Sequence, residues 1–245
     1  MDLGTLTFHG RAQDGSSTTI RFSELLLGRA ADGRLHSSGA GDGGSAGEAR
    51  WDLFLDPETA LAEGDLRFDA LPMGFVRPLV PFLPLHPSPE GTLSADLRLR
   101  TTAESTVEIE GRVAVTDVAL HSTRIADAPV TGITISLEGA GVWHPSERRL
   151  VWSTGHLRSD DAELRLSGEL GITEDAYKIR FEGTLPPTSC QAVVEAIPRD
   201  VLGPVASFRL AGRIGGRALV RIDSRRLADT EVELDVADGC EFISV

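Results

Sequence analysis

Histidines and paired carboxylates are the residues of this chain that could act as acids, bases or metal ligands. The six histidines lie far apart, and none stands in an HExxH pattern or at metal-ligand spacing from a cysteine. Asp160 and Asp161 are adjacent, but neighbouring residues of a strand point to opposite faces, so a solvated turn is the expected interpretation. A GxSxG nucleophile elbow does not occur. The sequence therefore predicts no catalytic residue, no metal site and no cofactor; the histidines are His9, His36, His86, His121, His144 and His156.

Cys190 and Cys240 are the only cysteines. Two cysteines are compatible with one disulfide in an oxidising compartment, and equally with two separate buried thiols. A bond would close a loop of about 50 residues and stabilise the fold by roughly 4 kcal/mol in the chain-entropy model. The spacing leaves both alternatives open, and a disulfide requires the two Cα atoms to lie within about 7 Å.

The stretch from Ser37 to Gly47 (SSGAGDGGSAG) is rich in glycine and serine. It lacks the GxGxxG spacing and the Lys-Ser/Thr ending of phosphate-binding loops. We therefore expect a flexible, solvated loop here and no nucleotide site.

The composition limits the classes of partner. The formal net charge of −13 argues against nucleic acid, which needs clustered Lys and Arg, and against docking on an anionic membrane surface. Hydrophobic residues make up 41% and charged residues 25%, which is ordinary for a folded domain. The chain contains no run of 18 apolar residues of the kind that spans a bilayer.

The elements that must position any site are strands. From Ala162 to Leu185, apolar residues alternate with polar ones on both sides of the turn Thr173–Ala176, which predicts an antiparallel hairpin. The same alternation predicts further strands at Leu3–Phe8, Thr19–Leu27, Arg50–Leu55, Asp65–Ala70, Leu93–Leu99, Val107–Val115, Ile133–Leu137, Leu150–Trp152, Phe208–Ile214, Ala218–Asp223 and Val232–Val236. The fold class is mainly β: a long, curved antiparallel sheet, either an open trough or a flattened barrel.

Two stretches break the strand pattern. Leu71–Pro89 carries six prolines, which predicts one or two short helical turns near 72–84 and an extended segment that either plugs the core or contacts lipid. Thr188 with Gln191 forms a capping box, which predicts a short helix over 188–197. Pro186 and Pro187 are expected to end the strand before it.

Four strands share the pattern apolar-x-Gly-x-apolar, with the glycine on the apolar face. They centre on Gly111, Gly168, Gly183 and Gly212. An inward glycine marks a bend or a close approach, so the repetition favours a trough over a flat sandwich.

The region from Asp65 to Ile197 resembles the AsmA-like family of bacterial envelope proteins. The Gly-centred strands, the crossover Pro78–Leu83 and the pattern Gly111-Arg112-Val113 followed by Asp117–Leu120 carry the resemblance. It implies a curved periplasmic sheet tethered to the inner membrane through a segment outside this chain, and a groove that binds phospholipid or a lipid-linked precursor. The residues expected to line that groove are Val107, Ile109, Gly111, Val113, Leu164, Leu166, Gly168, Leu170, Ile179, Phe181 and Gly183.

A second resemblance involves Cys190–Pro198, Leu202–Pro204 and Asp238–Cys240, which are similar to the region before the catalytic domain of some large bacterial peptidoglycan transglycosylases. It implies a non-catalytic arm, part of a larger protein, whose partner is a glycosyltransferase domain further along the chain. The lipid-binding groove is the alternative function. Residues 1–245 are expected to form one module, with a possible subdivision into 1–85 and 86–245.

Overall fold

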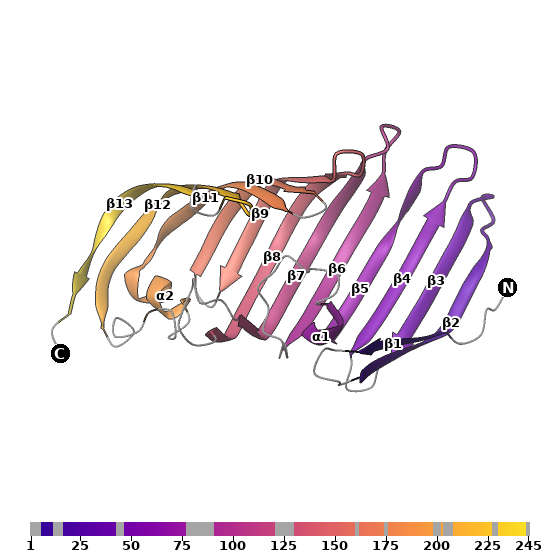
Figure 1. Cartoon of the computed structure of the whole chain (residues 1–245), viewed down its shortest axis with the longest axis horizontal. Helices are drawn as coiled ribbons and strands as arrows, with labels where there is room; N and C mark the ends of the chain where they lie inside the picture. The colour runs from indigo at the N-terminus through magenta and orange to yellow at the C-terminus, as the bar shows by residue number, and fades with distance from the viewer. Residues whose placement is uncertain are drawn as a thin grey trace.

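The computed structural model describes residues 6–11, 17–42, 47–76, 91–120, 130–159, 162–173, 176–197, 202, 208–226 and 230–243. Within these ranges, thirteen strands form one antiparallel sheet whose spatial order is the sequence order, β1 to β13 (Figure 1). The strands are β1 (Leu6–Arg11), β2 (Ser17–Arg29), β3 (Leu35–Asp42), β4 (Glu48–Leu55), β5 (Ala62–Pro72), β6 (Thr92–Thr101), β7 (Val107–Leu120), β8 (Val130–His144), β9 (Arg149–Ser159), β10 (Ala162–Ile172), β11 (Tyr177–Ser189), β12 (Leu210–Asp223) and β13 (Glu231–Phe242). Two short helices, α1 (Met73–Val76) and α2 (Cys190–Glu195), follow β5 and β11.

The mainly-β, antiparallel prediction is confirmed, and the sheet is an open, curved one. The predicted hairpin is β10 and β11, in the register that the alternation requires: Leu166 lies opposite Gly183, and Leu170 opposite Ile179. The turn closes with a hydrogen bond from the Thr173 N–H to the Ala176 carbonyl (2.8 Å). The sheet also continues without a break from β5 to β6, across residue 85.

The prediction of a loop over Ser37–Gly47 is wrong, because β3 runs through Asp42. The reason lies on the next strand. The Trp51 ring of β4 covers Gly39, where a Cβ atom would come within 2.3 Å of the indole. The Trp51 indole N–H also donates to the Ser37 hydroxyl (3.2 Å). Small residues in β3 therefore make room for a large neighbour. Residues 43–46 lie outside the described residues.

The predicted capping box before α2 is also wrong. Strand β11 continues through Pro186 and Pro187 to Ser189 with a register shift after Leu185, and α2 begins only at Cys190. The Thr188 hydroxyl donates to the Pro186 carbonyl (2.7 Å) instead of capping the helix. The Gln191 side chain accepts a hydrogen bond from the Leu210 N–H (2.9 Å), so it ties α2 to β12.

Other predicted boundaries shift. The strands expected at Phe208–Ile214 and Ala218–Asp223 are one strand, β12, because Gly215 and Gly216 continue the ladder with β13. The predicted helical turns after residue 72 are present as α1, and the rest of the proline-rich crossover, 77–90, lies outside the described residues, as do Asp160 and Asp161.

From β4 to β13, the strands turn mainly apolar residues to one side of the sheet and mainly charged or polar residues to the other. We call the first side the apolar face; Leu66, Leu97, Val113, Leu166 and Phe181 are among its residues. The opposite side, the charged face, carries residues such as Arg67, Asp96, Arg112 and Glu138.

A compact cluster forms where α1 meets the apolar face. Leu71, Met73 and Val118 are its buried members, and Phe68, Leu93, Val115 and Ile133 pack against them. Positive φ angles at Ala70 and Asp117 accompany register shifts in β5 and β7 that precede Leu71 and Val118. The Met73 N–H donates to the Gly91 carbonyl (3.0 Å), which holds α1 at the start of β6.

Gly168 and Gly183 test the role of the Gly-centred pattern. A Cβ at Gly168 would lie 2.3 Å from the Arg180 carbonyl oxygen and 2.7 Å from the Phe181 Cα, both backbone atoms of β11. A Cβ at Gly183 would meet only the flexible Leu164 side chain, at 3.3 Å. We therefore expect Gly168→Ala to lower the free energy of unfolding by about 1–3 kcal/mol and Gly183→Ala to change it by no more than about 0.5 kcal/mol. Urea unfolding of both variants provides the measurement, and equal losses would contradict the close approach.

Candidate functional site

The residues predicted to line a groove all lie on the apolar face. Those of β10 and β11 are direct neighbours, as in the pairs Gly168 with Phe181 and Leu170 with Ile179. The predicted residues of β7 are separated from β10 by two strands, β8 and β9. Strands β8 and β9 connect them through residues of the same face that were not predicted to line a groove: Leu137, Gly139, Gly141, Trp152, Gly155 and Leu157.

A strip without side chains crosses the middle of this face. Gly111 of β7 lies opposite Gly139 of β8, and Gly139 lies opposite Gly155 of β9. One row beside the strip consists of Val113, Leu137 and Leu157. A Cβ atom at Gly111 or Gly139 would meet backbone atoms of the next strand, and one at Gly155 would contact the Leu137 and Leu166 side chains, so the glycines of this row allow a close approach of neighbouring strands.

All three tryptophans of the chain occupy the apolar face. Trp51 lies opposite Leu66, Trp143 opposite Val107, and Trp152 opposite Gly168. The Trp152 indole N–H is buried and has no hydrogen-bond partner among the described residues. Alternation within a strand shows which residues share one side of that strand. Only the strand order and register show that the three tryptophans lie on the same face of the sheet.

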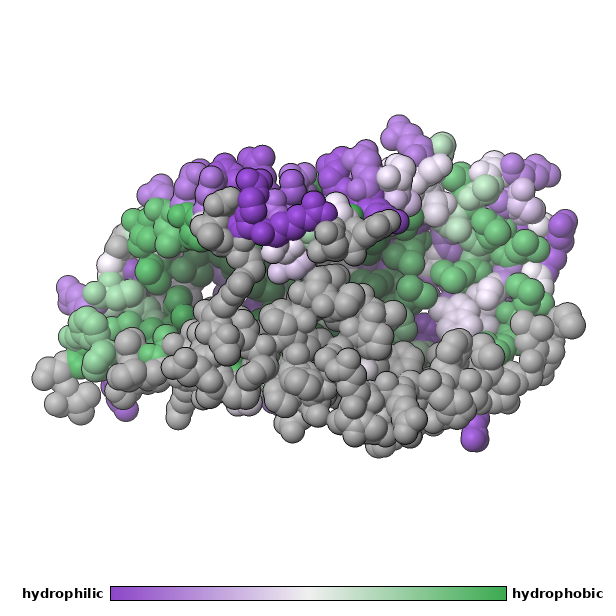
Figure 2. All heavy atoms as spheres, in the orientation of Figure 1, coloured by the Kyte–Doolittle hydropathy of each residue, from purple (hydrophilic) through white to green (hydrophobic). Residues whose placement is uncertain are grey.

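Several apolar side chains of this face remain exposed. Leu137 is 38% exposed, and on β13 the exposed fractions of Val232, Leu234 and Val236 are 55%, 68% and 56%. Figure 2 shows hydrophobic residues gathered on the face turned to the viewer, around β3–β5 and around β12–β13, with hydrophilic residues along the upper rim. The described residues include no buried polar or charged side chain.

The charged face is built from opposite charges on neighbouring strands. One row runs Arg67, Asp96, Arg112, Glu138 and His156 across β5 to β9, so that acid and base alternate. The ion pair between Arg67 and Asp96 is one of its contacts. Opposed charges on adjacent strands favour this register over one shifted by two residues.

Glu163 is a second example on the charged face. The His156 imidazole (3.0 Å) and the Arg158 guanidinium (3.3 Å) contact its carboxylate. The hydrogen bond with His156, followed by that with Arg158, holds the pKa of Glu163 below its usual value. The Glu163 side chain is 34% exposed and its partners lie at the surface, so the contacts orient the side chains and are of little consequence for stability.

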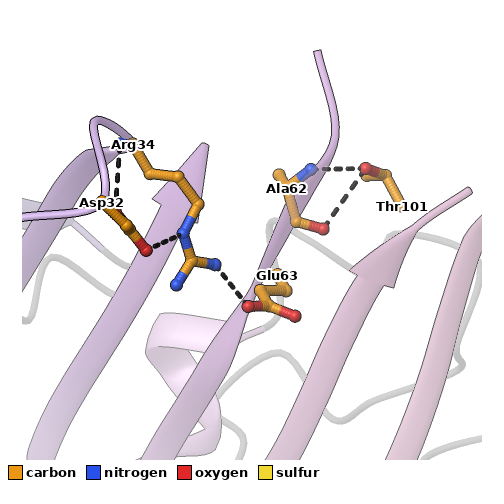
Figure 3. Close-up of polar contacts among 5 residues, drawn as sticks. All are labelled: Asp32, Arg34, Ala62, Glu63 and Thr101. Carbon is orange, nitrogen blue, oxygen red and sulfur yellow. Dashed lines mark hydrogen bonds and ion pairs between the residues drawn. The ribbon is translucent and has the colours of Figure 1, made fainter. Parts of the chain in front are cut away.

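The turn ends of the strands are joined by polar contacts (Figure 3). The Arg34 guanidinium bonds Asp32 within its own turn (2.7 Å) and reaches across to the Glu63 carboxylate of β5. The Ala62 N–H donates to the Thr101 hydroxyl of β6 (2.6 Å). These contacts hold the ends of β3, β5 and β6 in place.

A hollow of about 870 Å³ lies on the charged face beside β10 to β13. Its cations already have acidic partners: Arg221 bonds Glu231 (2.7 Å), and Lys178 lies 3.7 Å from Asp223. Because the positive charge is neutralised locally, the hollow does not form an anion site.

Cys190 and Cys240 form a disulfide that joins α2 to β13, with Cα atoms 5.8 Å apart. Cys190 is 1% exposed and α2 packs on β11 and β12. The bond therefore links β13, the last strand of the sheet, to α2, the helix that follows β11 in the chain.

The described residues contain no metal-site cluster and no membrane-spanning helix. Within them, no group of three or more His, Cys, Asp or Glu side chains is placed to hold a metal ion. Neither α1 nor α2 has the length and apolar character needed to cross a bilayer.

A search with models of known protein families gave no match to the chain. Comparisons with curated protein sequences and with solved structures likewise gave none. The resemblances described above therefore stay hypotheses.

Removing the disulfide tests its contribution. A Cys190→Ala/Cys240→Ala variant loses a cross-link between residues separated by 50 positions. We expect the free energy of unfolding to fall by about 4 kcal/mol, because the unfolded chain regains loop entropy. Urea unfolding of the variant, and of the native protein with and without reductant, provides the measurement. A loss below about 1 kcal/mol would contradict the prediction.

Proposed function

We propose that the protein binds the acyl chains of lipid on the apolar face of its sheet, in an oxidising compartment such as the bacterial periplasm. The observation that carries this proposal is a single apolar face, continuous from β4 to β13, whose side chains remain partly exposed.

The chemistry of the face favours an acyl chain over a polar ligand. Hydrogen-bonded ladders join every neighbouring pair of strands, so the face offers a ligand few backbone donors or acceptors. Non-directional contact with Leu, Val, Ile and aromatic side chains is what remains, and a hydrocarbon chain has no polar groups that would lose water there.

The dimensions of the face also support the proposal. Neighbouring strands lie about 4.8 Å apart, so the strands from β4 to β13 give a face roughly 43 Å long, measured across the strands. That length exceeds the hydrocarbon core of a bilayer, which is about 30 Å thick. More than one acyl chain could therefore lie along it.

The disulfide supports the compartment. Cys190 and Cys240 are bonded. Structural disulfides persist in the periplasm and outside the cell, and are rare in the cytosol. The resemblance to AsmA-like envelope proteins implies the same location.

Tryptophan fluorescence tests acyl-chain binding directly, because all three tryptophans lie on the apolar face. We expect a phosphatidylcholine with brominated acyl chains to quench this fluorescence, since bromine quenches on contact. The same lipid without bromine serves as the control. Equal fluorescence with both lipids, together with no lipid in native mass spectra of the purified protein, would overturn the proposal.

A matched pair of variants separates the two faces. Leu137 points to the apolar face, where Leu137→Glu would place a carboxylate in the lipid path; at 38% exposure, the carboxylate can reach water and the fold should persist. Ser136, the preceding residue, lies opposite Arg158 on the charged face, so the carboxylate of Ser136→Glu would face a positive charge. We expect at least a tenfold loss of lipid affinity for Leu137→Glu, because burying a carboxylate against hydrocarbon is costly, and no loss for Ser136→Glu. Similar affinities for both variants would place the lipid elsewhere.

A second candidate function is the non-catalytic arm of a peptidoglycan transglycosylase. One observation favours it: the disulfide joins Cys190 to Cys240, and so brings together two of the three segments that carry the second resemblance. Reading the coding sequence beyond Val245 tests it. An in-frame glycosyltransferase domain supports this function, whereas a stop codon or an unrelated domain contradicts it.

A further inference from the structure

β13 is a long and regular edge strand. It pairs with β12 from Glu231 to Phe242 without a register shift and contains no proline. On its other side, the described part of the chain provides no strand. Natural sheets usually protect such edges with short strands, bulges, prolines or inward charges.

The backbone groups that face this open side can be identified. The Ile243 N–H donates to the Arg209 carbonyl of the strand beside it (2.9 Å). In an antiparallel ladder, opposed residues alternate between hydrogen-bonded and non-bonded pairs. The register continues unshifted from the Ile243–Arg209 pair, so the odd-numbered residues of β13 bond to β12. The even-numbered residues, including Val232, Leu234 and Val236, therefore direct their N–H and C=O groups to the open edge.

The side chains at this edge are unprotected as well. Val232, Leu234 and Val236 are more than half exposed on the apolar face. The Cys190–Cys240 disulfide ties the part of β13 beyond Ala237 to α2. The unprotected part is thus Glu231–Ala237.

The charged face of this part is acidic. Glu231 and Glu233 both bond the Arg221 guanidinium of β12 (2.7 and 3.1 Å), and Asp235 lies opposite Arg217. Two copies of β13 paired antiparallel would set these acids against one another, and like charges directly opposite are destabilising. A strand with basic residues at the same positions would continue the alternation of charge found across the sheet.

We propose that residues Glu231–Ala237 of β13 bind a strand of a partner polypeptide, which adds to the sheet edge. The partner strand has apolar residues on the side of the apolar face and Arg or Lys on the side of the charged face. Backbone hydrogen bonds to Val232, Leu234 and Val236 hold it, and contacts with the three acids set its register. This site is independent of what occupies the apolar face.

A synthetic peptide of alternating arginine and valine tests the proposal, with a peptide of alternating glutamate and valine as its control. We expect the basic peptide to bind and to slow hydrogen exchange at the amides of Val232, Leu234 and Val236, while Glu233 and Asp235, already bonded to β12, show no change. Equal binding of the acidic peptide, or binding without protection of these three amides, would overturn the proposal. A dimer in sedimentation of the native protein with the three amides already protected would also overturn it, because a second copy would then occupy the edge.

Two substitutions at one residue isolate the backbone contribution. Leu234→Pro removes an N–H that faces the open edge and spares the ladder with β12, since proline is tolerated on edge strands in that orientation. Leu234→Ala removes the side chain and keeps the N–H. We expect Leu234→Pro to weaken peptide binding at least tenfold relative to Leu234→Ala, with both variants keeping the native amide protection of β10 and β11. Equal affinities for the two folded variants would show that the peptide does not pair with the edge.

Discussion

The antiparallel register is the constraint on which the whole structure depends. A shift of one residue between two strands would move every apolar side chain to the charged face. Burial of the apolar side chains therefore opposes a shift of one residue. The alternating charge row that contains Arg67, Asp96 and Arg112 opposes a shift of two residues, which would keep the faces but bring like charges together. These pairs are exposed, with Arg67 and Asp96 at 64% and 59%, so they add little to stability and act mainly by disfavouring the shifted pairings.

Most domains cover the apolar side of a sheet with a second layer. Here, a buried cluster is found where α1 meets β5 and β7, around Leu71, Met73 and Val118, and α2 covers part of β11 and β12. Elsewhere the described apolar side chains are mostly half-buried, as at Leu137. An occupant that removes this area from water would stabilise the folded state by an amount proportional to the area covered. Binding of an occupant and stability are therefore coupled in this architecture, and removing an occupant would lower the free energy of unfolding.

The sequence allowed prediction of strands and turns that depend on local alternation. Features that depend on contacts with a neighbouring strand were missed. The β10–β11 hairpin follows from alternation on both sides of a polar turn, and its register matched. Strand β3 was missed because Gly39 is explained only by the Trp51 ring of the next strand. The helix start at Cys190 was missed because a capping pattern at Thr188 competes with a strand that continues past two prolines. Groove-lining residues were predicted on β7, β10 and β11 and not on β8 and β9 between them, because strand order cannot be obtained from alternation alone. The choice between an open and a closed sheet depends on twist accumulated over many strands, which no single segment records.

Strand β13 carries both the disulfide and the open edge of the sheet. An edge strand has one neighbour and is prone to fraying, and its first residues to open are those farthest from other contacts. Cys240 lies in the half of β13 beyond Asp238, where the bond to α2 restrains the strand. The half from Glu231 to Ala237 lacks that restraint and is held by β12 through its backbone ladder and by the ion pairs of Arg221 with Glu231 and Glu233. The bond thus limits fraying of the strand without covering the N–H and C=O groups of Val232, Leu234 and Val236. A partner strand that paired with them would give β13 a second neighbour, so the half of the strand without a disulfide is the half in which added pairing would change the local stability most.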